Sequence, residues 1–344
     1  MKIIWLIRSW LAIVPLSLAF WLPIKSFSQP SLKDFHIAGF AQGTTYHITY
    51  YAKDIIATKE QLDSILDKID SSLSIYKSYS LISQFNNAVS GIEMDEHLRI
   101  VVLKSLEIYK ETEGISDITV YPVVNAWGFG PVHVVTLPDS GDIKNILPCV
   151  GSDKIHIHDN RLVKDTPCVK LDVNGIAQGY SVDVVADFLE KKGIQNYLVE
   201  IGGELRVKGR RQPGGELMKI GIEGPPKDIF DEQVIQKVIQ ADHGALTTSG
   251  NYRKFIQKDG KTFSHIMDPK TGYPIQNELI SVTVWAKDAI TADGYDNALM
   301  GMGLKKALLF MKQHTDMEAY FIYRGPNGSI SDTATTGFYN FFKQ

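Results

Sequence analysis

The chain has 344 residues, which is enough to bury a large core in one domain or in two closely packed ones. Lys and Arg number 36 against 39 Asp and Glu, so the formal net charge is −3, and 44% of the residues are hydrophobic. Such a mildly acidic chain offers no broad basic surface, and we therefore expect no nucleic-acid partner and no anionic membrane partner.

The N-terminal residues are typical of a targeting segment. A short basic start with Lys2 and Arg8 precedes an apolar run, and small residues follow at Ser26 and Ser28. This order predicts a signal peptide over residues 1–28 and export to the periplasm or to the periplasmic face of the inner membrane. The alternative is a retained anchor, because the apolar run approaches spanning length, and membrane association is expected only through such an uncleaved segment.

Residues 29–344 are predicted to form the functional domain. Strand-like and helix-like segments alternate there without a low-complexity linker. We therefore predict an α/β (α+β) fold, in one large domain of mixed sheets with packed helices. The predicted strands are 45–52, 196–203, 279–286 and 318–325, and the predicted helices are 58–74, 97–113, 179–193, one ending near 302, and 304–314.

Cys149 and Cys168 are the only cysteines, and each directly follows a proline. In an oxidising compartment they could form a disulfide that closes a short loop. Two buried free thiols agree with the sequence equally well. Two cysteines alone cannot make a zinc site.

Three short motifs occur in the order used by penicillin-binding serine enzymes. They are SIYK at 74–77, SGN at 249–251 and KTG at 270–272. The flanking prolines of MDPKTGYP predict a turn, whereas the serine enzymes need their third motif on a strand. The sequence therefore argues against that class.

The stretch TADGYDNALMGMG at 291–303 carries Asp293, Asp296 and Asn297, which share one face of a helix at spacing i, i+3 and i+4. One interpretation is a half-exposed helix with a solvated acidic face. The other is a site for a hard cation, which prefers carboxylate and amide oxygens.

A glycine-rich stretch, LDVNGIAQGYSVD at 171–183, is predicted to join the end of a strand to the start of a helix. Asn174, Gly175 and Gly179 surround this turn and would expose backbone groups to a phosphate or a metal. Glycines at such a turn can also serve only to relieve strain.

Eight sequence blocks together resemble the ApbE family of flavin transferases, whose members use FAD and Mg²⁺ to attach FMN to a hydroxyl of a target protein. The blocks follow the family order and span about residues 40 to 303. They are GTTYHITYY, SLSIYKSYSLISQFNN, GISDITVYPVVNAWGFG, LDVNGIAQGYSVD, LVEIGGELRVKG, TTSGNYRKF, SHIMDPKTGYP and SVTVWAKDAITADGYDNALMGMG.

The resemblance implies a magnesium site. The family holds its metal with an aspartate and a threonine four residues apart in an ADALxTA helix, and with a backbone oxygen of a GGIAKG turn. These positions match Asp293, Asn297 and Gly175. Asn297 replaces the threonine, but an amide oxygen is also a suitable Mg²⁺ ligand. Asp296 stands where the family is usually not acidic, and it could replace or supplement a ligand.

The resemblance also implies flavin contacts at Tyr76, Asp117, Asp172 and Gln178. Gln178 stands in place of the usual lysine, which removes one positive charge near the pyrophosphate. The histidine of the family's SHIIDP block matches His265, which is expected to act as base or orienting group for the acceptor hydroxyl. The alternative for His265 is a surface residue of a turn.

The activity implied by the resemblance is that of a Mg²⁺-dependent FAD:protein FMN transferase. FAD and a Ser or Thr hydroxyl of an acceptor protein, typically an exported redox subunit, would give a phosphoester-linked FMN and AMP. With water as acceptor, the same site would be an FAD pyrophosphatase. A non-catalytic flavin-binding protein is the third possibility, because Gln178 and Asn297 depart from the family pattern.

Overall fold

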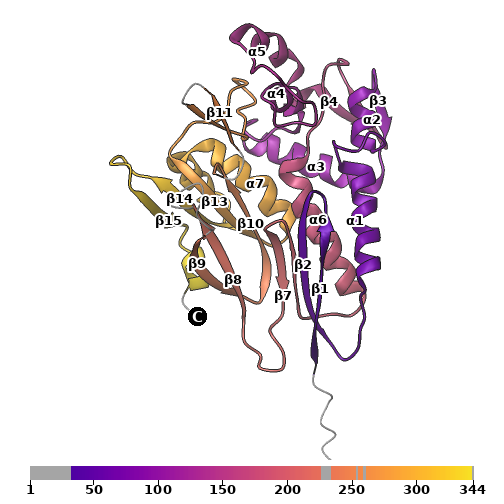
Figure 1. Ribbon diagram of the computed structural model, residues 1–344, viewed down its shortest axis with the longest axis vertical. Coiled ribbons are helices and arrows are strands. Elements are labelled where there is room, and N and C mark those ends of the chain that lie inside the picture. Colours follow the sequence, from indigo (N-terminus) through magenta and orange to yellow (C-terminus); the bar gives the residue numbers. More distant parts are fainter. Residues whose placement is uncertain (1–31, 226–233, 253–254, 259–260, 343–344) are drawn as a thin grey trace, which may run out of the picture. The chain divides into compact units, whose positions relative to one another are not determined.

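An eight-stranded antiparallel sheet organises the domain (Figure 1). The computed structural model describes residues 32–225, 234–252, 255–258 and 261–342, so the predicted signal peptide at 1–28 lies outside the described residues. Each strand pairs antiparallel with its neighbours, which is the α+β form of the predicted fold class. The strand order is β1 (Lys33–Ala41), β2 (Thr44–Ala52), β6 (Tyr197–Ile201), β7 (Glu204–Lys208), β10 (His243–Gly250), β13 (Leu279–Ala286), β14 (Glu318–Arg324) and β15 (Ile330–Ala334).

Five helices of eight or more residues in the described part of the chain share the main hydrophobic core with one face of this sheet. Val199 of β6 and Val284 of β13 belong to this core and are fully buried. None of the helices in the described part of the chain is both long and apolar enough to cross a membrane. The five helices are α1 (Lys59–Leu73), α3 (Glu96–Glu111), α6 (Asn174–Lys191), α7 (Ala289–Met302) and α8 (Leu304–Met311).

The opposite face of the sheet has a core of its own, formed with the hairpin β8 (Met218–Gly224) and β9 (Val234–Ala241) and with the 3-10 helix η4 (Phe338–Phe342). Strand β13 contributes Ile280 to this second core and Val282 to the main one. Because both of its faces are covered, every residue of β13 except Trp285 is buried, including Ser281 and Thr283.

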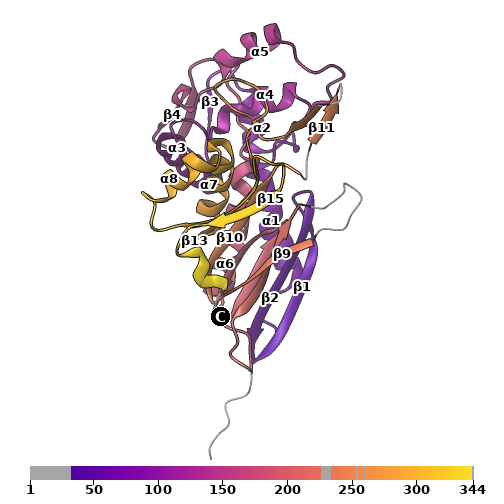
Figure 2. The ribbon, with the colours of Figure 1, turned by 90° about the vertical axis from the view of Figure 1, so that its left-hand side faces the viewer.

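A third group of elements lies together at one end of the domain in both views (Figures 1 and 2). Trp127, Ile143 and Met267 form its small core. Beside it, β3, β5 and β4 make a separate antiparallel sheet in that order. These elements are α2 (Leu81–Asn87), β3 (Gly91–Glu93), η1 (Ile118–Val120), α4 (Tyr121–Ala126), α5 (Ser140–Ile146), η2 (Leu147–Cys149), η3 (Ser152–Lys154), β4 (Ile155–His158), β5 (Arg161–Lys164), β11 (Phe255–Lys258) and β12 (Lys261–Ser264).

The predicted single domain of helices and sheets is confirmed, and so are most of its predicted elements. Strand 279–286 and the helix ending at Met302 have the expected bounds, and Thr58 forms a capping box at the start of α1. The glycine-rich stretch is different, because α6 begins at Asn174 and a loop over 165–173 precedes it in place of a strand. The KTG motif lies in a turn, as expected.

Cys149 and Cys168 form a disulfide, with 5.3 Å between their Cα atoms. The alternative of two free thiols is therefore wrong. The bridge joins η2 to the loop that precedes α6.

Candidate functional site

One cavity of about 480 Å³ brings together the residues that the sequence singled out. It lies between the β1–β2 turn, the start of α6, the 3-10 helix η1, strand β10 and helix α7. All eight predicted site residues line it: Tyr76, Asp117, Asp172, Gly175, Gln178, His265, Asp293 and Asn297.

The acidic face of α7 is buried. Asp293 is 4% exposed and Asp296 is 1% exposed, so the interpretation of a solvated surface helix is wrong. The backbone N–H of Gly179 donates to Asp293 Oδ2 at 2.8 Å. A side chain at Gly179 would place its Cβ 2.3 Å from the carbonyl oxygen of Ala289. Gly179 therefore permits the close approach of α6 and α7, and it does not form the turn that the sequence suggested.

The two buried carboxylates disfavour each other's ionised form. Burial and the nearby Asp183 charge raise the pKa of Asp293 to about 7, against the hydrogen bond from Gly179. Burial and the Asp293 charge raise the pKa of Asp296 well above its ordinary value. The Thr247 hydroxyl lowers this pKa slightly, but Asp296 Oδ1 has no hydrogen-bond partner of regular geometry within the described chain. A cation at this place would relieve both effects.

Asn297 connects α7 to the start of α6 and to β10. Its Nδ2 donates to the carbonyl oxygen of Gly175 at 3.3 Å, and its Oδ1 accepts from Ser249 Oγ at 2.9 Å. Gly175 has non-helical backbone angles within α6 (φ −83°, ψ 15°). For Asn297 Oδ1 to act as a metal ligand beside Gly175, the amide must turn over, after which its Nδ2 can donate to Ser249.

The residues around Asp293 suit a hard divalent cation. Carboxylate oxygens, an amide oxygen and a backbone carbonyl are the donors that Mg²⁺ prefers, and an orphaned carboxylate oxygen is present. The described residues contain no group of three or more His, Cys, Asp and Glu side chains arranged to hold a metal, so the amide and carbonyl oxygens are needed. The described lining includes no Lys or Arg but includes Asp117, Asp172, Glu204, Asp293 and Asp296. An anionic substrate would be repelled here unless a cation were bound.

Another part of the cavity wall carries Asp117 and Asp172, which are 8% and 9% exposed. Asp117 Oδ1 accepts from Thr119 N, Thr119 Oγ1 and Ser152 Oγ, and its Oδ2 accepts from Ser152 N, all at 2.6–3.1 Å. Burial raises the pKa of Asp117 in spite of these bonds. Asp172 Oδ1 accepts from Asn174 N at 2.9 Å. Both carboxylates therefore fix the wall, and their contact with flavin stays a prediction.

The side chains of Tyr76 and Gln178 differ in how accessible they are to a ligand. The Tyr76 side chain lines the cavity while the residue remains 61% exposed, which leaves its ring accessible to a ligand. Gln178 Nε2 donates to the carbonyl oxygen of Ile201 at 2.8 Å and to the Glu204 carboxylate. Gln178 thus binds the turn between β6 and β7, and it brings no charge to the cavity.

His265 follows β12 and lines the cavity with its ring edge-to-face against Phe129, at 6.2 Å between ring centroids. The residue is partly buried. Its place in the cavity lining favours the predicted site role over that of a surface turn residue, and the role itself stays a prediction.

Three further residues support the site and were not identified from the sequence. Asp183 accepts from the backbone N–H groups of Ala289 and Ile290 at 3.0 and 2.8 Å, so it caps the start of α7. Glu204 and Ser249 hold Gln178 and Asn297. In the sequence, Asp183 could have been found from its spacing of four residues from Gly179, because this spacing places both residues on one face of a helix.

The fold is that of a known family. The sequence pattern of the ApbE family matches residues 42–321, and this chain belongs to the ApbE family. It is 37% identical over 308 residues to the FAD:protein FMN transferase of Vibrio cholerae, covering 88% of this chain and 90% of the relative. It is also 37% identical over 320 residues to the FAD:protein FMN transferase of Haemophilus influenzae, covering 89% of this chain and 91% of the relative.

Solved structures agree with this assignment. The flavin transferase ApbE from Vibrio cholerae superposes with a TM-score of 0.81 at 35% identity, covering 90% of this chain and 99% of that one. The apo form of the Pseudomonas stutzeri flavinyl transferase ApbE gives a TM-score of 0.81 at 34% identity, covering 91% and 98%.

We expect Mg²⁺ to stabilise the protein more at pH 8 than at pH 5.5. The raised pKa values, about 6 for Asp183 and about 7 for Asp293, stabilise the metal-free fold at low pH, and this contribution is lost as pH rises through 6 to 7. A bound cation favours the ionised carboxylates and offsets that loss. Thermal melting with and without Mg²⁺ measures the difference, and Asp293→Asn should remove most of it. An equal Mg²⁺ effect at both pH values would contradict the assignment.

We expect Asn297→Thr to retain metal binding, because threonine offers the oxygen usual in the family. Asn297→Leu, similar in size but without a donor oxygen, should raise the Mg²⁺ concentration needed by at least about tenfold. Calorimetric titration with Mg²⁺ measures this directly. Asp296→Ala, alone and combined with Asn297→Leu, is the matched control. If only Asp296→Ala weakens binding, the ligand is Asp296.

Proposed function

We propose that this chain is a Mg²⁺-dependent FAD:protein FMN transferase that transfers FMN to a Ser or Thr hydroxyl of an acceptor protein. The observation that carries the proposal is the cavity, because residues from all eight sequence blocks of the family line it together. The name shared by the relatives from Vibrio cholerae and Haemophilus influenzae supports the same reaction.

The reaction breaks the pyrophosphate of FAD. The acceptor oxygen forms a bond to the FMN phosphorus, the bond from that phosphorus to the AMP oxygen breaks, and the hydroxyl proton passes to a base. Such a transfer depends on positioning and on charge neutralisation more than on covalent help from the enzyme. AMP leaves, and the flavin remains joined to the acceptor through a phosphoester.

Different residues of the cavity would bind the cation and the flavin. Asp293, the Gly175 carbonyl and Asn297 would hold Mg²⁺ on the α7 side. When bound, the ion would supply positive charge that lets the pyrophosphate enter an acidic cavity and stabilises the departing AMP. The open ring of Tyr76 is available to flavin, and the wall with Asp117 and Asp172 would shape the part of the cavity that receives it.

His265 is proposed as the group that accepts or orients the acceptor proton. Its ring faces Phe129 within the cavity, and it is the one histidine in the described lining. Imidazole changes its charge near neutral pH, which suits a general base.

Export is proposed together with this function. The basic and apolar start of the sequence supports a signal peptide over residues 1–28. The Cys149–Cys168 disulfide gives independent support, because such bonds persist in oxidising compartments. An acceptor in the same compartment, such as an exported redox subunit, would then meet the enzyme.

Water as the acceptor remains a second reaction of the same cavity, because a small nucleophile needs no docking surface. AMP release without an acceptor protein measures this FAD pyrophosphatase activity. A flavin-binding protein without activity would release no AMP under any condition.

We expect purified protein to release AMP from FAD and to make an acceptor fluorescent only when Mg²⁺ is present. Asp293→Ala should abolish both signals while the fold is kept, because loss of a charged metal ligand removes several kcal/mol of transition-state stabilisation. Chromatography of AMP and in-gel flavin fluorescence are the measurements, with circular dichroism as the control for folding. Full turnover in excess EDTA would refute the metal-dependent mechanism.

We expect His265→Ala to slow flavin transfer by about a hundredfold with little change in FAD affinity, as loss of a general base does. Rates at saturating FAD and the dissociation constant of FAD separate the two effects. A variant with the normal rate but weaker FAD binding would make His265 a binding residue.

A further inference from the structure

The wall of the cavity that carries Asp117 and Asp172 is built from three segments that form a closed ring. We call residues 117–119, 149–152 and 168–172 the flavin wall. They are distant in the sequence, and Asp117, Ile118 and Asp172 line the cavity.

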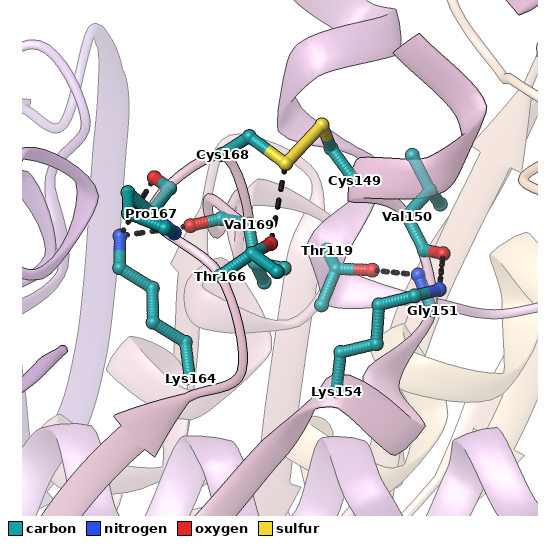
Figure 3. The surroundings of a disulfide bond; sticks show 10 residues. All are labelled: Thr119, Cys149, Val150, Gly151, Lys154, Lys164, Thr166, Pro167, Cys168 and Val169. Carbon is teal, nitrogen blue, oxygen red and sulfur yellow. Dashed lines mark hydrogen bonds between the residues drawn. A yellow bond between two sulfur atoms is a disulfide. The ribbon is translucent and has the colours of Figure 1, made fainter. Parts of the chain in front are cut away.

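Hydrogen bonds join the first two segments. Ser152 donates twice to Asp117, from N at 3.1 Å and from Oγ at 2.6 Å, and Gly151 N donates to Thr119 Oγ1 at 2.6 Å. Lys154 Nζ donates to the carbonyl oxygen of Val150. The segment that follows Cys149 is thus bound directly to Asp117, which lines the cavity, and to Thr119; Figure 3 shows the bond from Gly151 to Thr119.

The third segment returns to the first. Asp172 N donates to the carbonyl oxygen of Ile118 at 2.7 Å, and Asn86 exchanges two hydrogen bonds with the backbone of Leu171 at 2.7 and 2.9 Å. Lys164, which is 6% exposed, donates to the carbonyl oxygens of Phe85 and Val169, both at 2.9 Å. Lys164 therefore holds Val169, near the start of this segment, against Phe85 of α2.

The Cys149–Cys168 disulfide is the covalent bond that closes this ring (Figure 3). Cys168 is exposed, so a small reductant can reach the bond. The second and third segments each bond to the first, and just beyond them Asp165 N donates to the carbonyl oxygen of Lys154 at 3.0 Å, where β4 pairs with β5. The disulfide is the covalent link between the two segments themselves. Opening the disulfide would leave Gly151 and Ser152 held to Asp117 and Thr119 by hydrogen bonds alone.

We propose that the Cys149–Cys168 disulfide positions the flavin wall and that its reduction weakens FAD binding. This rests on the proposed function, because it names FAD as the ligand of the wall. The disulfide acts through Ser152 and Asp117, and it touches no reacting atom. At FAD concentrations below saturation, transfer would then be slower wherever the disulfide is reduced.

The chemistry of the switch is thiol–disulfide exchange with a dithiol. A thiolate of the dithiol attacks Cys168 Sγ, the bond to Cys149 Sγ breaks, and Cys149 leaves as a thiolate that takes up a proton. The second thiol of the reagent then attacks the mixed disulfide, which releases Cys168. Two electrons pass to the protein, and the reagent ends as a cyclic disulfide.

The test compares oxidised protein with protein reduced by dithiothreitol, using flavin fluorescence to measure the dissociation constant of FAD. Mg²⁺ is present, the acceptor is absent, and AMP is measured alongside. We expect FAD binding to weaken by about tenfold on reduction, within the range usual for coupled sites, with the rate at saturating FAD little changed. Cys149→Ser with Cys168→Ser is the matched control, and it should bind FAD weakly with and without dithiothreitol.

A reciprocal measurement separates positioning from general stability. If reduction weakens FAD binding by a given factor, saturating FAD must make the disulfide harder to reduce by the same factor. The fraction of reduced protein in a dithiol buffer, with and without FAD, gives that factor, and circular dichroism of the reduced protein should be unchanged. Equal FAD affinity in both states, or loss of the circular dichroism signal on reduction, would overturn the inference and leave the proposed function intact. Absence of FAD binding in either state would overturn both.

Discussion

Two carboxylates, Asp293 and Asp296, are buried side by side on one helix, and the cavity around them depends on this constraint. A buried carboxylate without a partner costs several kcal/mol, and a second one nearby adds repulsion. Such a pair must bind a cation or hold protons. With three further carboxylates and no Lys or Arg in the described lining, the cavity can accept a pyrophosphate only together with positive charge. This arrangement supports the proposed preference of the site for a metal-bound anionic substrate.

The scaffold serves to keep that pair in place. Asp183 of α6 caps α7 through two backbone N–H groups, and Gly179 of the same helix approaches closely enough to donate to Asp293. Strand β10 holds Asn297 through Ser249, and β10 lies inside a sheet that is covered on both faces. Rigid elements therefore carry the proposed cation side of the cavity, whereas loops joined by a disulfide carry the proposed flavin side.

Periodicity in the sequence predicted the long elements well, because α1 and β13 bury apolar residues in simple patterns. It also placed Asp293 and Asn297 on one helical face. It could not tell a buried acidic face from a solvated one, since that depends on β10 and α6, which meet α7 only in the folded chain. Asp183 and Ser249 act through such long-range contacts. The sequence likewise could not decide whether Cys149 pairs with Cys168, because their loops come together only in the folded chain.

The most direct test of the carboxylate pair is to locate the cation. Crystals grown with Mn²⁺ and FAD, measured near the manganese absorption edge, give an anomalous signal only where the metal lies. The account predicts a peak about 2.2 Å from an Asp293 carboxylate oxygen, also within ligand distance of the Gly175 carbonyl. A cavity that holds FAD with no peak there, or with manganese bound elsewhere, would contradict it.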